Sequence, residues 1–349
     1  MDLAQILGVA VPLIQAPMAG VQDHRLAVAV CAAGAVGSLP CSYLGHEQLR
    51  AEIAALSTAA STPYNVNFFC HPLPAPDAAR EQAWRTTLHP FYTAFAVEPP
   101  TATTVPRATF DAEVVAILRA FRPPIVSFHF GLPDRALLAA LKDWGATIVS
   151  SATTVAEARW LEAHGADVII AQGWEAGGHR AMFLTSDLTT QLGTFALVPQ
   201  IVAAVRRPVV AAGGIADERG IAAALALGAS GVQIGTAFLL CDEARTSAPH
   251  RAAIQRDDAH TAVTNLFTGR PARGVENALM RALGPLRADL PAFPLAAGAL
   301  VPLRAAAEAQ GRDDATPLWA GQNRSGCRTV SATTLVQELA AGFVASETV

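Results

Sequence analysis

The chain has 349 residues, of which 52% are hydrophobic and 15% are charged, and its formal net charge is −4 at pH 7. This composition is typical of a protein with a large buried core and excludes a disordered chain. The slightly negative charge, without any block of Lys and Arg, argues against nucleic acid as a partner.

The sequence also argues against secretion and membrane insertion. The N-terminus lacks a basic segment before an apolar one, so a secretory signal is not expected. The longest apolar run, 26–39, contains two glycines and is shorter than the roughly 18 residues of a membrane span. The five cysteines are widely spaced and form no Cys-x-x-Cys pair, which favours reduced thiols in a cytoplasmic protein.

Short apolar segments alternate with helical ones through most of the chain. In order, we predict strands at 11–16, 35–39, 64–70, 125–131, 147–150, 167–171, 208–214 and 231–239. The predicted helices are 23–34, 45–56, 112–121, 134–144, 155–164, 198–205 and 217–228. This order predicts an α/β fold, a closed parallel (β/α)8 TIM barrel. An open doubly wound sheet is the alternative topology.

Two stretches differ from this pattern. Residues 71–124 are rich in proline and aromatic residues, and only 112–121 is predicted as a helix there. Residues 240–321 contain arginine-dotted helices and several prolines, which favours a mainly helical subdomain over one end of the barrel. We therefore expect a barrel made of 1–239 and 322–349, with 240–321 inserted as the substrate-side subdomain.

Uncharged polar residues and glycines occur where the predicted strands end, which is where such barrels build active sites. They are Gln15, Asn67, His129, Gln172, Gly213, Gly214, Gln233, Gly235 and Thr236. Amide side chains suit a neutral heterocycle and would not suit a metal, so no metal site is expected. Glycine-rich loops after the seventh and eighth strands suit a phosphate. A phosphate site beside an amide-lined slot indicates flavin mononucleotide (FMN).

The loop after the sixth strand is the strongest candidate for chemistry. Gly177 and Gly178 allow the backbone to approach a ligand closely, and they place His179 near the end of a strand. A histidine there is suited to act as a general base, because its unperturbed pKa of about 6.5 is close to physiological pH. The alternative is a structural loop whose histidine caps a helix.

His129 is the second candidate catalytic residue. It alternates with Phe128 and Phe130 along a strand, so it faces the barrel interior near the mouth if both phenylalanines pack outward. The alternative is a buried histidine that hydrogen-bonds to a backbone carbonyl.

Several motifs together resemble the first class of the nitronate monooxygenase family, in order and over nearly the whole chain. They are Gln-Ala-Pro-Met-Ala-Gly at 15–20, Ser-Phe-His-Phe-Gly-Leu-Pro at 127–133, Ala-Gln-Gly-Trp-Glu-Ala-Gly-Gly-His-Arg at 171–180, Ala-Ala-Gly-Gly-Ile at 211–215 and Leu-Trp-Ala-Gly-Gln at 318–322. The second and third of these motifs are the most specific.

The resemblance implies a barrel that binds FMN without a covalent bond and oxidises alkyl nitronates, such as propionate 3-nitronate, with O2 to a carbonyl compound and nitrite. It implies His179 as the catalytic base. It places FMN contacts at Met18, Asn67, Gln172, Gly177, Gly214, Gln233, Ile234, Gly235, Thr236 and Gln322. One position departs from the family pattern, because Ala181 stands where a glycine is usual.

Two other functions remain open on the sequence alone. An FMN barrel that takes hydride from NAD(P)H, such as an enoyl or quinone reductase, shares the glycine-rich loops. A barrel that binds a flavin or phosphate without catalysis is the more distant alternative. The expected partners are a small-molecule nitronate and O2, with no nucleic acid and no membrane, for a monomer or homodimer.

Overall fold

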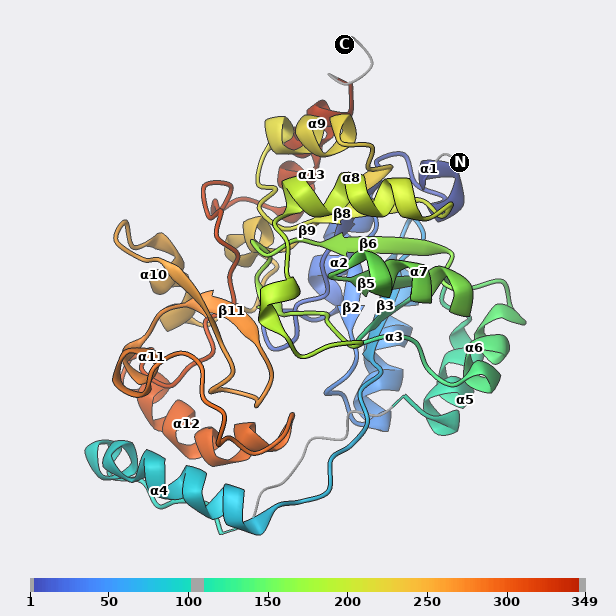
Figure 1. Cartoon of the computed structure of the whole chain (residues 1–349). Helices are drawn as coiled ribbons and strands as arrows, with labels where there is room; N and C mark the ends of the chain where they lie inside the picture. Colours follow the sequence, from blue (N-terminus) through green and yellow to red (C-terminus); the bar gives the residue numbers. More distant parts are fainter. Residues whose placement is uncertain (1–2, 102–109, 345–349) are drawn as a thin grey trace.

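Eight parallel strands form a nearly closed barrel in the computed structural model, which describes residues 3–101 and 110–344 (Figure 1). The sheet runs in the order β1-β9-β8-β6-β5-β4-β3-β2. The strands are β1 (Leu13–Gln15), β2 (Ser38–Pro40), β3 (Asn65–Phe69), β4 (Ile125–His129), β5 (Thr147–Ala152), β6 (Val168–Gln172), β8 (Val209–Ala212) and β9 (Gly231–Ile234). The barrel prediction is confirmed, and the open sheet is not formed.

Backbone hydrogen bonds connect the two ends of this sheet. Gln15 N donates to the Val36 carbonyl at 2.9 Å, and Val36 N donates to the Leu13 carbonyl at 2.9 Å. Val36 lies two residues before β2, so these bonds pair β1 with the chain that leads into β2. Closure makes the carboxyl ends of all eight strands point to one mouth.

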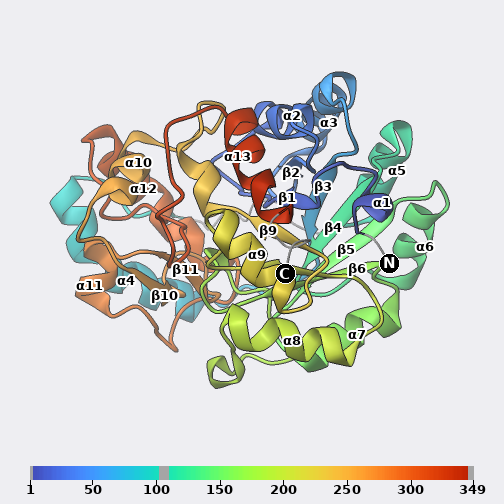
Figure 2. The ribbon, with the colours of Figure 1, turned by 90° about the horizontal axis from the view of Figure 1, so that it is seen from above.

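Helices surround the barrel and cover the outer face of its strands (Figure 2). They are α2 (His24–Ala32), α3 (His46–Ala59), α5 (Ala112–Phe121), α6 (Arg135–Lys142), α7 (Val155–His164), α8 (Thr194–Ala204), α9 (Glu218–Ala226) and α13 (Ala332–Val344). The C-terminal helix α13 packs against α9 and α2. The last part of the described chain therefore packs on the barrel again, after the segment that covers the barrel mouth.

The N-terminal end of the barrel is filled by side chains. Leu3 and Leu7 of α1 (Leu3–Leu7) belong to one buried cluster with inward-facing strand residues such as Ile14, Val168 and Val210. An apolar plug of this kind leaves no ligand space at that end. Any site inside the barrel must therefore open at the carboxyl ends of the strands.

Gly37 shows how closely the barrel wall and its helices approach each other. A Cβ at this position would lie 2.6 Å from the Ala27 carbonyl carbon and 2.7 Å from Ala27 Cα, both backbone atoms of α2. We expect Gly37→Ala to lower the free energy of unfolding by about 1–3 kcal/mol through overpacking. Urea unfolding measures this change. Gly45→Ala is the control, because a Cβ there meets nothing within 4 Å, and equal stability of the two variants would contradict the close approach.

A second group of elements covers one side of the barrel mouth. It contains α10 (Ala248–Gln255), β10 (Thr261–Thr264), β11 (Ala272–Val275), α11 (Ala278–Leu283), η3 (Leu295–Leu300) and α12 (Val301–Ala309). The helix α4 (Ala78–Phe95) packs against η3 and α12 (Figure 1). We call these elements, with the loops between 240 and 321, the capping unit.

The capping unit differs from the sequence prediction in two respects. The prediction left 78–95 without a helix because Pro90 and several aromatic residues lie there, yet Trp84, Leu88 and Tyr92 repeat every four residues and are buried. The second difference is an antiparallel pair, β10 and β11, which β7 (Gly178–His179) extends to three strands. The division of the chain at 240 and 321 stays a prediction. Residues 1–2 and 345–349 of the predicted barrel, and 102–109 of the proline-rich stretch, lie outside the described residues.

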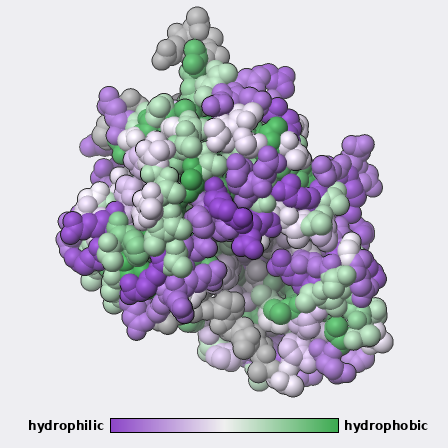
Figure 3. Space-filling model, turned by 180° about the vertical axis from the view of Figure 1, so that it is seen from behind, coloured by the Kyte–Doolittle hydropathy of each residue, from purple (hydrophilic) through white to green (hydrophobic). Residues whose placement is uncertain are grey.

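No helix within 3–101 and 110–344 has the length and apolar character to cross a membrane. On the face seen in Figure 3, hydrophilic and hydrophobic residues are intermixed.

Candidate active site

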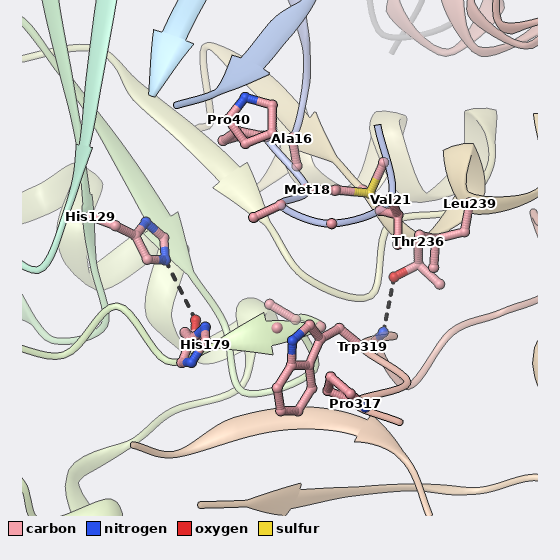
Figure 4. A pocket seen from close by; sticks show the side chains of 18 of the residues that line it. Ala16, Met18, Val21, Pro40, His129, His179, Thr236, Leu239, Pro317 and Trp319 are labelled. Carbon is pink, nitrogen blue, oxygen red and sulfur yellow. Dashed lines mark hydrogen bonds between the residues drawn. The ribbon is translucent and has the colours of Figure 1, made fainter. Parts of the chain in front are cut away.

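A cavity of about 440 Å³ lies at the carboxyl ends of the strands, between the barrel and the capping unit. Strand ends and loops of the barrel form one wall, and Phe267, Thr268, Leu300 and Trp319 belong to the opposite wall. Figure 4 shows His129 and His179 on one side and Trp319 and Pro317 beside them. The volume lies in the range of small-molecule and cofactor sites.

Most of the residues predicted from strand ends and motifs line this cavity together. They are Met18, Asn67, His129, Gln172, Gly177, Gly178, His179, Gly213, Gly214, Gln233, Ile234, Gly235 and Thr236. Gln15 and Gln322 do not line it. Because β7 and the loops that follow β8 and β9 all reach the mouth, residues far apart in sequence share one space.

Gln15 lies behind the cavity wall and supports it. Its Oε1 accepts a hydrogen bond from Ser38 N at 3.0 Å, and its Nε2 donates to Gln22 Oε1 at 2.9 Å. Gln22 Oε1 also accepts from Met18 N at 2.8 Å. This pair of amides, of which Gln15 is buried, fixes the loop that carries Met18, so Gln15 acts on the site through its neighbours.

Gln322 is exposed, whereas its two neighbours line the cavity. Gly321 N donates to Thr236 Oγ1 at 2.9 Å, and Asn323 Nδ2 donates to the Gly214 carbonyl at 2.9 Å. These bonds tie 321–323 to both glycine-rich loops. The predicted turn therefore reaches the site through its backbone and Asn323, and a contact from the Gln322 side chain stays a prediction.

The Gln172 amide holds the loop that carries His179. Its Nε2 donates to the His179 carbonyl at 3.0 Å, and its Oε1 accepts from Ala181 N at 2.9 Å. Ala181 is buried and has a negative φ, so the loop needs no glycine there. An alanine therefore fits this position without backbone strain.

Arg180 lies beneath this loop and is fully buried. Its guanidinium donates to the carbonyls of Gly173 at 2.6 Å and Gln172 at 2.9 Å, and to Gln191 Oε1 at 2.9 Å. Burial lowers the pKa of Arg180 to about 10, which still leaves it protonated at neutral pH. With its donors used on the protein, Arg180 supports the loop and does not face a ligand.

A buried carboxylate that the sequence prediction missed completes this support. Glu157 of α7 accepts from Thr153 N at 2.7 Å and Thr153 Oγ1 at 2.7 Å, and from Phe183 N at 2.6 Å. Gln191 Nε2 in turn donates to Thr153 Oγ1 at 3.0 Å. The pattern of α7 alone gives no signal for the contact with Phe183, because Phe183 lies 26 residues further along the chain.

His179 lies in an aromatic pocket with one polar partner for its ring. Its Nε2 is 3.0 Å from Thr268 Oγ1. Its ring centroid lies 5.3 Å from that of Phe293 and 5.5 Å from that of Trp319. Burial, followed by the positive charge of Arg270, lowers the pKa of His179 to about 3. The imidazole is therefore neutral at physiological pH, with one unprotonated ring nitrogen.

His129 faces the cavity as predicted, but its two neighbours do not both pack outward. Phe128 packs with Phe110 in the cluster behind the strand. Phe130 has a φ of 69°, and its ring lies 6.1 Å from that of His179, on the side of the site. The strand ends at His129, so the alternation assumed for Phe130 stops there. His129 Nε2 makes a long contact of 3.5 Å with the His179 carbonyl oxygen.

The other arginines near the mouth differ in what their guanidinium groups face. Arg270 lies over the Phe130 ring at 3.8 Å and donates to the Met182 carbonyl. Arg273 is buried and donates to the Trp174 carbonyl at 3.0 Å. Arg304 lines the cavity, with its Nε 2.8 Å from Glu308 Oε1. Across the described ranges, no group of three or more His, Cys, Asp or Glu residues is arranged to hold a metal ion.

Comparison with known proteins decides the family. The model of the nitronate monooxygenase family matches residues 2–342. A nitronate monooxygenase from Pseudomonas aeruginosa is 43% identical over 96% of this chain and 98% of its own length. The chain belongs to the nitronate monooxygenase family.

Other proteins similar to this chain agree with that assignment. A nitronate monooxygenase from Paraburkholderia phytofirmans is 41% identical over 97% of the chain and 93% of its own length. Among solved structures, a nitroalkane oxidase from Streptomyces ansochromogenes covers 100% of the chain and 99% of its own, with 37% identity and a TM-score of 0.90. FabK from Thermotoga maritima covers 99% and 96%, with 25% identity and a TM-score of 0.73. The protein is therefore an oxidoreductase, and the resemblance seen in its motifs is confirmed.

Proposed function

We propose that this protein binds FMN in the cavity and oxidises alkyl nitronates with O2 to a carbonyl compound and nitrite. The observation that carries the proposal is one cavity that joins two glycine-rich loops, free amide groups and a neutral histidine. The names of the relatives support the substrate class. FMN, when bound, would supply the chemistry of accepting electrons from the nitronate.

The glycine-rich loops fit the phosphate of such a cofactor. The backbone N–H groups of Gly214 and Gly235 donate to no other described residue, and both glycines line the cavity. Gly214 has a φ of 75°, a conformation that side chains disfavour. Free N–H groups at glycines that follow two adjacent strands are the usual donors to phosphate in such barrels.

The amide side chains fit the heterocycle. Asn67 Nδ2 donates to Ser127 Oγ at 2.9 Å, which leaves its Oδ1 without a donor among the described residues. Gln233 lines the cavity, and its side-chain amide makes no hydrogen bond to another described residue. These groups would accept from and donate to the edge of an isoalloxazine ring. Met18 and Ile234 add apolar contact to the same wall.

Gly177 lies where the cavity wall leaves no room for a side chain. A Cβ there would lie 2.5 Å from Gly321 N and 2.6 Å from the Ala320 carbonyl carbon. We expect Gly177→Ala to push 320–321 away and to weaken FMN binding by about 10-fold or more, because the backbone atoms cannot yield without moving the loop. Titration of the apoprotein with FMN, followed by flavin fluorescence, measures the change. Gly45→Ala, outside the cavity, should bind FMN like the wild type, and so would Gly177→Ala if the wall tolerated a side chain.

For a neutral nitroalkane, the proposed role of His179 is to remove the proton from the carbon next to the nitro group. The C–H bond breaks, the proton goes to the imidazole, and the electron pair moves into the nitro group to give the nitronate anion. Burial, and after it the positive charge of Arg270, lowers the pKa of His179. The same positive charge favours an anion in the cavity over a neutral molecule. A preformed nitronate needs no such step.

Anaerobic mixing tests the proposal against the alternative function. The FMN-loaded protein should lose its flavin absorbance band on addition of ethyl nitronate and keep the band on addition of NADH or NADPH. Bleaching by a nicotinamide alone would overturn the proposal and support a reductase.

A further inference from the structure

The hydroxyl of Thr268 is the one polar side-chain group of the described residues that hydrogen-bonds to the His179 ring, at 3.0 Å from Nε2. Thr268 comes from the loop between β10 and β11, 89 residues further along the chain, and it lines the cavity. The rest of the ring is surrounded by aromatic edges, with Phe69, Phe130 and Phe293 close to it. The capping unit therefore supplies the polar group that orients the candidate base.

The other bonds of Thr268 decide which atom carries the shared proton. Its Oγ1 lies 3.3 Å from the Arg270 carbonyl oxygen, which has no proton to give and must accept. Arg270 N donates to the same Oγ1 at 3.3 Å. When its single proton goes to that carbonyl, the hydroxyl accepts from the imidazole, and His179 Nε2 is the protonated nitrogen.

The second nitrogen of the ring is left as the basic one. His179 Nδ1 hydrogen-bonds to no described residue, and it is not among the side-chain atoms that are both buried and unpartnered. Since His179 lines the cavity, a ligand can reach this atom. A neutral imidazole has one donor and one acceptor nitrogen, so fixing the first fixes the second.

We propose that Thr268 is a positioning residue, which holds His179 as the Nε2–H tautomer so that Nδ1 removes the α-proton of the substrate. This inference rests on the proposed function, in which His179 is the base. When Nδ1 takes the proton, the C–H electron pair moves into the nitro group and His179 becomes an imidazolium. Its Nε2–H bond to Thr268 then becomes charge-assisted, so the hydroxyl stabilises the product of proton transfer more than the reactant.

The short strand β7 makes this support necessary. It contains only Gly178 and His179, and Gly178 has a φ of 71°. The backbone of His179 is fixed through pairing with Ala272 and through Gln172, but neither contact reaches the imidazole. Without the hydroxyl, the ring keeps its apolar neighbours and loses the group that selects its tautomer and rotation.

Thr268→Val tests the inference, because valine keeps the shape and removes the hydroxyl. We expect kcat/KM for nitroethane to fall about 10- to 100-fold, the range for one hydrogen bond to a group that becomes charged. Turnover of preformed ethyl nitronate should change less than about threefold, since no proton is removed. Thr268→Ser should recover most of the loss. The inference would be overturned by a Thr268→Val variant that is as active as the wild type on nitroethane. It would also be overturned by a variant that keeps FMN and loses activity on both substrates equally.

A matched control removes a hydroxyl that makes no hydrogen bond. Thr246 Oγ1 is buried, has no partner among the described residues, and does not line the cavity. Thr246→Val should leave the ratio of the turnover of nitroethane to that of ethyl nitronate as in the wild type. A wild-type protein that oxidises neither substrate would refute the proposed function itself, which is a different outcome from a normal wild type with an unaffected Thr268→Val.

Nitrogen NMR of the wild type tests the tautomer directly. In protein labelled with 15N at its nine histidines, the His179 signals are assigned by their loss in His179→Asn. We expect a proton on Nε2 and none on Nδ1 at pH 7. A proton on Nδ1, with Nε2 accepting from the hydroxyl, would overturn the assignment.

Discussion

Replacement of His179 by Asn is expected to lower kcat/KM for a neutral nitroalkane by about 100- to 10,000-fold, the usual contribution of a general base. Asparagine keeps a donor near Thr268 but offers no group that accepts the α-proton. Turnover of the corresponding preformed nitronate should fall only a few-fold. Parallel assays of nitrite release from nitroethane and from ethyl nitronate measure both rates.

The control for this prediction is His89→Asn. His89 lies on the exposed side of α4 and is not among the residues that line the cavity. It should leave both rates unchanged. Equal losses with nitroethane and ethyl nitronate in His179→Asn would remove the base assignment, because the nitronate route contains no proton abstraction.

Replacement of Arg180 by Met is expected to lower the free energy of unfolding by about 3 kcal/mol or more. The change removes the guanidinium donors of the Gln172 carbonyl and the Gln191 amide oxygen, and it leaves the Gly173 carbonyl with Ala176 N alone. Urea unfolding followed by circular dichroism measures the loss. The ratio of KM for propionate 3-nitronate to KM for ethyl nitronate should stay as in the wild type, because Arg180 does not face the cavity.

Arg304→Met is the contrasting variant for this prediction. Arg304 is half-buried, lines the cavity and pairs with Glu308, so we expect it to be the arginine within reach of a substrate carboxylate. We expect it to raise KM for propionate 3-nitronate selectively, with little effect on stability. A stable Arg180→Met protein with a selective defect on the carboxylated substrate would contradict the structural role of Arg180.

The local part of the fold was predictable from sequence. Helices 112–121 and 155–164 have the predicted ends because Asp111 and Thr154 cap them through side-chain hydrogen bonds. Parallel strands bury both faces, so short apolar runs such as 125–129 stand out between helices. The barrel mouth then follows, since all strand ends point the same way.

The parts of the site that the sequence did not predict depend on contacts between segments far apart in the chain. Thr268, Phe293 and Trp319 reach His179 from the capping unit, and no spacing along the chain indicates that they meet it. The supporting role of Arg180 could not be predicted, because sequence gives its charge but not its burial. Phe130 left the predicted alternation because the strand ends one residue before it.

Oxygen uptake by the FMN-loaded protein, on addition of an alkyl nitronate and with no nicotinamide present, tests the proposed function most directly. The proposal predicts rapid uptake of O2 together with release of nitrite, with ethyl nitronate and with propionate 3-nitronate. An FMN-loaded protein that consumes no O2 with either nitronate would contradict it, and His179 would then need a different role.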